Sequence, residues 1–177
     1  MPCDYYGSFA ETHKGHGTVF AIIRGILGFA TDNERVPLAV EIAEEEGVQI
    51  EFVERKEMSP VNHANTADLT LSDEKRTIRL IGISVGGGAV DVRVIEVDGF
   101  TMELTGPLPI LLEVVSLGEM PKVYQLLQEH GVTISKQRVE MAENRQMIGY
   151  ELADLLSPEL KQQIQTLRQT HTIYLFA

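Results

Sequence analysis

The segment Gly7–Thr18, GSFAETHKGHGT, gathers the side chains of this sequence that are best suited to chemistry. His13 and His16 could ligate a metal ion, but an i, i+3 spacing within a glycine-rich loop does not fix a ligand geometry. A metal site would also need a further ligand such as His63, which the sequence cannot place nearby. We therefore predict no metal site in this loop.

A small anion suits the same loop better. Gly15 and Gly17 let the backbone approach a ligand, and the apolar helix expected from Thr18 would point its first amides into the loop. Lys14 adds a positive charge, and His16 can donate or exchange a proton near neutral pH. A carboxylate or a phosphate would fit this site. The alternative is a solvated turn between a strand and a helix.

Two other segments could contact a ligand. Gly86, Gly87 and Gly88 in GISVGGGAV lack the spacing of a nucleotide loop, and an alternating strand follows them instead of a helix. We predict a kink in a sheet there, with a ligand pressed against the backbone as the alternative. His63 and Asn65 lie in the polar loop NHANTA, which gains a role only from further evidence.

Cys3 is the only cysteine, which excludes an internal disulfide, a thiolate zinc site and an iron–sulfur cluster ligated wholly by this chain. It has no evident activating partner. Ser8 and Ser84 lack the sequence context of a nucleophile elbow. We predict no catalytic residue, no metal and no cofactor in this chain.

The composition excludes further classes of protein. With 177 residues, of which 44% are hydrophobic and 23% charged, the chain is globular. A formal net charge of −11 disfavours nucleic-acid binding, because an acidic surface repels phosphodiester backbones. No apolar run is long enough to span a membrane, and no signal peptide is recognisable. We expect a cytoplasmic protein that binds no membrane.

The N-terminal part mixes strands and helices. The pattern predicts a strand over 4–10, a helix with Thr18 as its N-cap, a helix over 37–47, and strands over 48–54, 67–72, 76–86 and 89–106. Asp98-Gly99 is the signal of a hairpin turn within the last of these. We expect an α/β fold with a substantial antiparallel sheet up to Thr105.

The C-terminal part, Ile110–Phe176, has the element order βαββαβ, which is that of ferredoxin-like domains. Gly131 ends its first helix, and Ser157 followed by Pro158 starts the second. The short segment Gly106–Pro109 is the best candidate for a boundary. We predict two domains, 1–105 and 106–177, in an α/β (α+β) chain.

Four motifs in this order resemble one family. YGSFAETHKGHGT, DNERVP, HANT and IGISVGGGAVDVRVIEVDGFTMELTG resemble the beta subunit of the iron–sulfur-dependent L-serine dehydratase, or L-serine ammonia-lyase, from about Tyr5 to Thr105. In that family this part is called the allosteric substrate-binding domain, and a βαββαβ ACT regulatory domain follows it. The resemblance therefore implies an ACT-like domain at the C-terminal end of this chain.

The resemblance also implies a two-chain lyase that converts L-serine to pyruvate and ammonia, in amino-acid metabolism and gluconeogenesis. The alpha chain would carry a 4Fe–4S cluster and the catalytic step, and this chain would bind substrate or regulate. Together with Lys14 of the anion loop, the matched motifs give the expected ligand or alpha-interface residues: Lys14, Gly15, His16, Gly17, Thr18, His63, Asn65, Thr66, Gly86, Gly87 and Gly88.

Two features depart from the family pattern. The usual N-terminal segment with a serine-serine-serine-histidine-threonine motif is missing, so we expect an isolated chain without lyase activity. An exposed edge left by that segment would favour a homo-oligomer. The usual aspartate-x-proline-glycine turn of the ACT part reads SLGEMPKV, with Lys122 after Pro121. A side chain at the glycine position argues against the usual amino-acid effector site.

The leading hypothesis is a beta subunit of an L-serine dehydratase, whose partners are an alpha subunit and L-serine or another small carboxylate. The alternative is a stand-alone, non-catalytic ACT-containing module for regulation or oligomerisation. The altered turn and the absent motif favour this alternative. Neither hypothesis involves nucleic acid or a membrane.

Overall fold

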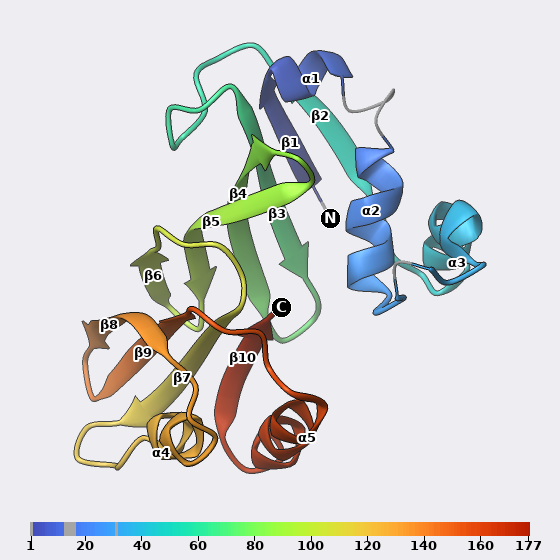
Figure 1. Cartoon of the computed structure of the whole chain (residues 1–177). Coiled ribbons are helices and arrows are strands. Elements are labelled where there is room, and N and C mark those ends of the chain that lie inside the picture. The colour runs from blue at the N-terminus through green and yellow to red at the C-terminus, as the bar shows by residue number, and fades with distance from the viewer. Residues whose placement is uncertain (1, 13–16, 31) are drawn as a thin grey trace. The chain divides into compact units, whose positions relative to one another are not determined.

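The structure is a computed structural model that describes residues 2–12, 17–30 and 32–177. These residues form two sheets with short helices (Figure 1), which confirms the predicted mixed α/β class. By its internal contacts the chain divides into two compact units, Met1–Ser84 and Val85–Ala177. The predicted domains, 1–105 and 106–177, whose boundary we placed at the Gly106–Pro109 segment, stay a prediction.

Four strands form the sheet of the first unit, in the order β2-β1-β3-β4. Their bounds are β1 Pro2–Gly7, β2 Glu51–Arg55, β3 Asn65–Ser72 and β4 Thr77–Gly86. The β1–β3 and β3–β4 pairs are antiparallel as expected, whereas β1 and β2 run parallel. Cys3 and Tyr5 of β1 are fully buried, and the Tyr5 ring stacks on Phe52 of β2 at 5.8 Å between centroids. The sheet therefore buries its central strand.

Helices α2 and α3 confirm the two helices predicted in this unit. The helical segments are α1 Ser8–Thr12, α2 Thr18–Ile26, the 3-10 turn η1 Val36–Leu38 and α3 Ala39–Glu45. Ile23 of α2 packs on Ala39 and Ala43 of α3, and all three are fully buried. Within the described ranges, no helix is both long and apolar enough to cross a membrane.

Two local predictions near the glycine-rich loop are wrong. The strand predicted over 4–10 ends at Gly7, because a φ of 55° takes this residue out of the extended region, and α1 follows at once. Thr18 is not the N-cap of α2. Gly17 holds that position with a φ of 66°, and no side chain caps the helix. Both differences arise where a glycine adopts a left-handed conformation.

In the second unit, β5 (Ala89–Val97) and β6 (Phe100–Glu103) form the predicted hairpin. Asp98 and Gly99 have φ values of 53° and 84°, as a type I′ turn requires.

Gly86 is the last residue of β4, and Gly87 and Gly88 form the tight turn that leads into β5, so the three glycines do not form a kink inside a strand. Gly86, Gly87 and Gly88 have φ values of 93°, 63° and 81°. A Cβ atom added to any of them would meet no described atom within 4 Å. Their left-handed backbone explains the glycines here, and a close approach of other protein atoms does not.

The C-terminal elements confirm the predicted βαββαβ order. They are β7 Ile110–Ser116, α4 Lys122–Glu129, β8 Ile134–Ala142, β9 Arg145–Leu152, α5 Pro158–Leu167 and β10 Thr172–Phe176. The strands form an antiparallel sheet in the order β10-β7-β9-β8. The Ser157 hydroxyl caps α5 by accepting from the Leu160 amide at 3.2 Å, as predicted, and Gly131 follows α4 with a φ of 64°.

Helices α4 and α5 cover one face of this sheet (Figure 1). Val123 and Leu127 of α4 and Leu160 and Ile164 of α5 are buried in one apolar cluster with Tyr150 of β9. The 3.6-residue spacing of these positions explains why each helix packs by a single stripe.

The β5–β6 hairpin packs against the opposite face. Ile148 and Tyr150 of β9 point to the helices, so Gly149 between them points away from the helices. Met102 of β6 places its sulfur where a side chain at residue 149 would stand. Glycine at this position therefore makes room for the hairpin.

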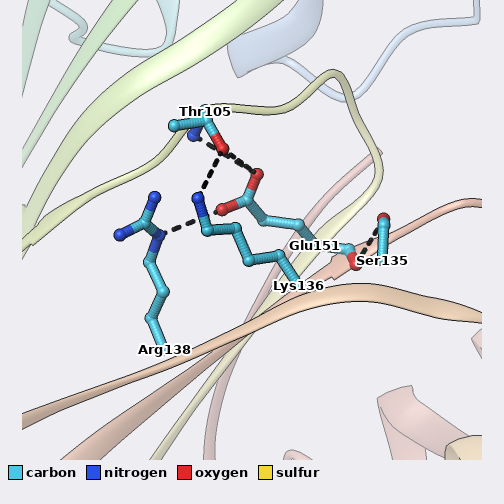
Figure 2. A network of polar contacts seen from close by, with 5 residues as sticks. All are labelled: Thr105, Ser135, Lys136, Arg138 and Glu151. Atoms are coloured by element: carbon cyan, nitrogen blue, oxygen red, sulfur yellow. Dashed lines mark hydrogen bonds and ion pairs between the residues drawn. The ribbon is translucent and has the colours of Figure 1, made fainter.

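A buried carboxylate fixes the connection between β6 and β7 (Figure 2). Glu151, which is 3% exposed, accepts from Arg138 Nε at 3.1 Å and from the amide and hydroxyl of Thr105 at 3.2 and 3.1 Å. Lys136 Nζ donates to the Thr105 hydroxyl at 3.3 Å. A Cβ atom on Gly106 would lie 2.5 Å from Glu151 Oε2. These contacts attach the predicted boundary segment to the sheet.

Candidate functional site

The end of β1 is in direct contact with the HANT segment. A Cβ atom on Gly7 would lie 2.5 Å from the carbonyl oxygen of Ala64 and 2.9 Å from its Cα. The Phe9 amide donates to the same carbonyl at 3.4 Å, and the Ser8 hydroxyl donates to Asn65 Oδ1. We call this contact, Gly7–Phe9 against Ala64–Asn65, the β1–HANT junction. It places Asn65 beside the segment that leads into THKGHGT.

Ser59 shapes the loop that carries HANT. This side chain is 9% exposed; its hydroxyl accepts from the His63 amide at 2.8 Å and donates to the His63 carbonyl at 3.0 Å. The same carbonyl accepts from the hydroxyl of Thr66 at 2.6 Å, and Thr66 is fully buried. The loop is thus held by its own side chains. Thr66 serves the backbone of the loop and does not reach outward.

The His63 ring is oriented by its own segment. The amide N–H of Asn65 donates to Nδ1 of His63 at 3.1 Å. A neutral imidazole whose Nδ1 accepts carries its proton on Nε2. His63 therefore offers an N–H donor at Nε2, on a ring that is half-buried.

Two pockets adjoin the junction, and both are lined by Gly7 and Lys56. One has a volume of about 420 Å³ and is lined also by Glu57, Ser59, Asn62 and His63. We call it the HANT pocket. The other has a volume of about 660 Å³ and lies along α1 and the end of β2. Both volumes are within the range of small-molecule sites.

Known proteins share much of this sequence. The chain is 43% identical over 137 residues to a Bacillus subtilis (strain 168) protein named "Probable L-serine dehydratase, beta chain". The matched region covers 76% of this chain and 60% of that protein. It is also 33% identical over 108 residues to the L-serine dehydratase beta chain of Peptoniphilus asaccharolyticus. This second matched region covers 60% of this chain and 47% of that protein. The chain is a homologue of the L-serine dehydratase beta chains. It spans 60% and 47% of the lengths of these two relatives, and no protein-family model matches it.

Most of the anion loop of this beta-chain homologue lies outside the described residues. His13, Lys14, Gly15 and His16 belong to that part, so anion binding by this loop stays a prediction. Its last two residues, 17 and 18, are described and form the start of α2. The loop is therefore entered from α1 and left at α2, and it begins a few residues after the β1–HANT junction.

The other predicted site residues of the homologue fall into two groups. His63, Asn65 and Thr66 meet at and next to the β1–HANT junction, whereas the glycine turn 86–88 belongs to the second compact unit. Sequence reasoning missed Gly7 and Ser8, although the motif YGSFAET contained them. Ser8 meets Asn65 across 57 positions in the chain, and residue spacing cannot reveal such a pairing.

Two carboxylates of the homologue face each other within the first sheet. Asp4 of β1 and Asp68 of β3 are register partners. Arg55 binds Asp4 at 3.1 Å, while Arg79 holds the 6%-exposed Asp68 with two bonds of 2.8 and 2.7 Å. Burial raises the pKa of the neighbouring Tyr6 hydroxyl. Each carboxylate therefore has its own arginine, which offsets the repulsion between them.

Cys3 belongs to β1, and its side chain is fully buried. Burial raises the pKa of its thiol to about 12, so the thiol stays protonated at neutral pH and is a poor nucleophile. In the described part of the chain, no group of three or more His, Cys, Asp or Glu side chains could hold a metal ion.

A carboxylate from the sheet occupies the start of α4 in the second unit. The N-cap residue, Pro121, makes no side-chain cap. Instead, Glu113 of β7 accepts from the amides of Lys122 and Val123 at 2.8 and 3.0 Å. Burial raises the pKa of Glu113, and the two amide donors oppose that shift. The amides that could bind an anionic ligand here are thus used by the chain itself.

Proposed function

We propose that this chain is the beta subunit of an L-serine dehydratase and acts together with an alpha subunit. The names of the two homologous beta chains support this proposal. The overall reaction removes water from L-serine to give aminoacrylate, which water then converts to pyruvate and ammonia. The alpha chain would hold the 4Fe–4S cluster, which would assist the loss of the serine hydroxyl. This chain would hold no cofactor.

The β1–HANT junction carries the proposal. It joins Asn65, whose amide orients the His63 ring, to Ser8 in the segment that precedes the THKGHGT loop, while Gly7 packs on the neighbouring Ala64. These side chains can donate to and accept from the polar groups of a small amino acid. Their role would be to bind and orient L-serine, or to contact the alpha chain, at the interface of the two subunits.

We further propose that residues 106–177 form an ACT-like domain with a structural rather than a sensing role at its first turn. The βαββαβ order and the strand order β10-β7-β9-β8 support an ACT-like arrangement. Glu113 occupies the amides of Lys122 and Val123 at the start of α4, so a carboxylate effector would have to compete with Glu113 for these donors. This agrees with the side chain of Lys122 at the position where the family has glycine.

Co-expression with a serine dehydratase alpha chain tests the subunit proposal. We expect a tagged alpha chain to retain this chain through affinity and size-exclusion steps, and Gly7→Ala to weaken that retention because the junction is distorted. The proposal would be contradicted if the tagged alpha chain retained neither the wild-type chain nor Gly7→Ala while both of these were folded.

A stand-alone regulatory module is the second candidate function. Its non-sensing form, a module for oligomerisation, is the one in agreement with the start of α4, because Glu113 occupies the Lys122 and Val123 amides that an effector would use. The two candidates differ in that only a subunit forms a stable complex with an alpha chain. Sedimentation of the purified chain alone and with an alpha chain separates them.

A further inference from the structure

The HANT pocket contains a charged pair with no part in the fold described so far. Lys56 and Glu57 are exposed neighbours that both line the pocket. No ion pair joins Lys56 to a carboxylate among the described residues. Among the described residues, Glu57 lies at the long ion-pair distance of 4.0 Å from Arg55. Both charges are therefore available to a ligand.

The segment that carries this pair is fixed at both ends. On one side, Arg55 at the end of β2 is tied to Asp4 of β1 at 3.1 Å. On the other side, Ser59 makes two hydrogen bonds to the backbone of His63. Residues 56–58 are thus a short bridge between two anchored points. The backbone that carries the two charges therefore loses little conformational entropy when a ligand binds, and the entropy cost is confined to the two side chains.

We propose that Lys56 and Glu57 recognise a zwitterion in the HANT pocket, with the ligand carboxylate on Lys56 and its ammonium group on Glu57. This inference rests on the proposed function and deepens it, because it names two residues that select the substrate class. The Nε2–H of His63 and the amide group of Asn62 line the same pocket and supply donors and an acceptor for a hydroxyl group of the ligand.

The charge pattern separates amino acids from other small anions. A phosphate or a dicarboxylate would meet Lys56 but would also face Glu57, which repels it. A simple amine would meet Glu57 but would face Lys56. Arg55 cannot replace Lys56 without giving up its bond to Asp4. A small α-amino acid satisfies both charges at once.

Calorimetry on the full chain with three matched ligands tests the inference. L-serine carries both charges, L-glycerate has the same configuration but a hydroxyl in place of the ammonium group, and L-serinamide lacks the carboxylate. We expect wild-type protein to bind L-serine at least about tenfold more tightly than either analogue, because each lost charge removes a charge-assisted contact.

Two variants assign the two charges. Lys56→Met is expected to weaken the binding of L-serine and L-glycerate by about tenfold and not to weaken the binding of L-serinamide. Glu57→Gln should weaken the binding of L-serine and L-serinamide and should not weaken the binding of L-glycerate. Lys75→Met, which removes the same charge from the turn between β3 and β4, serves as the matched control and should behave as wild type.

The inference is overturned if wild-type protein gives no heat with L-serine, or if both variants bind all three ligands as wild type does. Retention by an alpha chain is measured separately. A chain that joins the alpha subunit but shows either result would keep the proposed function and lose the zwitterion site. A chain that binds L-serine with the expected pattern but joins no alpha subunit would keep the zwitterion site and lose the proposed function.

Discussion

Gly7 and Ala64 lie so close together that no side chain larger than hydrogen fits at residue 7. The added Cβ atom would stand 2.5 Å from the Ala64 carbonyl oxygen, and Gly7 also has a φ of 55°. The end of β1 and the HANT segment are therefore joined backbone to backbone. This contact is the basis on which the candidate site is built.

Replacing Gly7 tests that contact. Gly7→Ala should destabilise the protein by more than the roughly 1–2 kcal/mol that a left-handed alanine costs, because the clash with Ala64 is added. Gly28→Ala is the matched control: its φ is 68°, yet an added Cβ would meet no described atom within 4 Å. Urea unfolding of both variants gives the comparison. Equal losses of stability would show that the close approach is unimportant.

The arginine on Asp68 should be essential for the first sheet. Arg79→Met leaves a 6%-exposed carboxylate unpaired opposite Asp4, and we expect a loss of about 3 kcal/mol in the free energy of unfolding. Adding Asp68→Asn should recover most of that loss, since the buried charge is gone. Arg76→Met, at an exposed position, controls for the change in net charge. A double variant no more stable than Arg79→Met would contradict this account.

Glu113 should make stability depend on pH. Its pKa is raised in the folded protein above the ordinary 4.5 by burial, so the folded state holds its proton more tightly than the unfolded state. Its favourable contribution is complete below about 4.5 and is lost as the pH rises through the higher folded value. The melting temperature of Glu113→Gln should therefore fall less than that of wild type from pH 4 upward. If the melting temperatures of the two proteins fell in parallel with rising pH, Glu113 would not be the source of the pH dependence.

The Glu151 network should protect a particular backbone amide. The Thr105 N–H donates to Glu151 Oε2 at 3.2 Å, so Glu151→Ala should speed its hydrogen exchange at least about tenfold. The neighbouring Leu104 N–H donates to the Arg93 carbonyl at 2.8 Å within the hairpin and should change much less. Equal acceleration at both amides would indicate general unfolding instead of a local clamp.

The sequence allowed good predictions where local signals and periodicity agree. Ser157 with Pro158 marked the start of α5, Asp98-Gly99 marked the hairpin, and the βαββαβ order followed from these and from apolar spacing. Local signals failed at residues 7–10. The apolar character of DYYGSFA suggested one strand, but the left-handed Gly7 ends that strand and starts α1.

Tertiary contacts lay beyond the reach of sequence patterns. HANT was recognised as a motif, yet its meeting with Ser8 depends on how β1 and β3 pair within the sheet. The cap that Glu113 provides for α4 likewise crosses between elements, and Pro121 gives no hint of it. The loop residues 13–16 lie outside the described residues, so their predicted role is unchanged.

The most direct test of the central claim is pyruvate release from L-serine by an alpha chain purified with this chain, measured beside the alpha chain alone. We predict activity in the complex that exceeds that of the alpha chain alone. We also predict that Asn65→Ala lowers kcat/KM at least about tenfold without preventing assembly, because the junction loses a polar group that we propose to bind or orient L-serine. Equal pyruvate release with and without this chain, or an Asn65→Ala complex as active as wild type, would contradict the account.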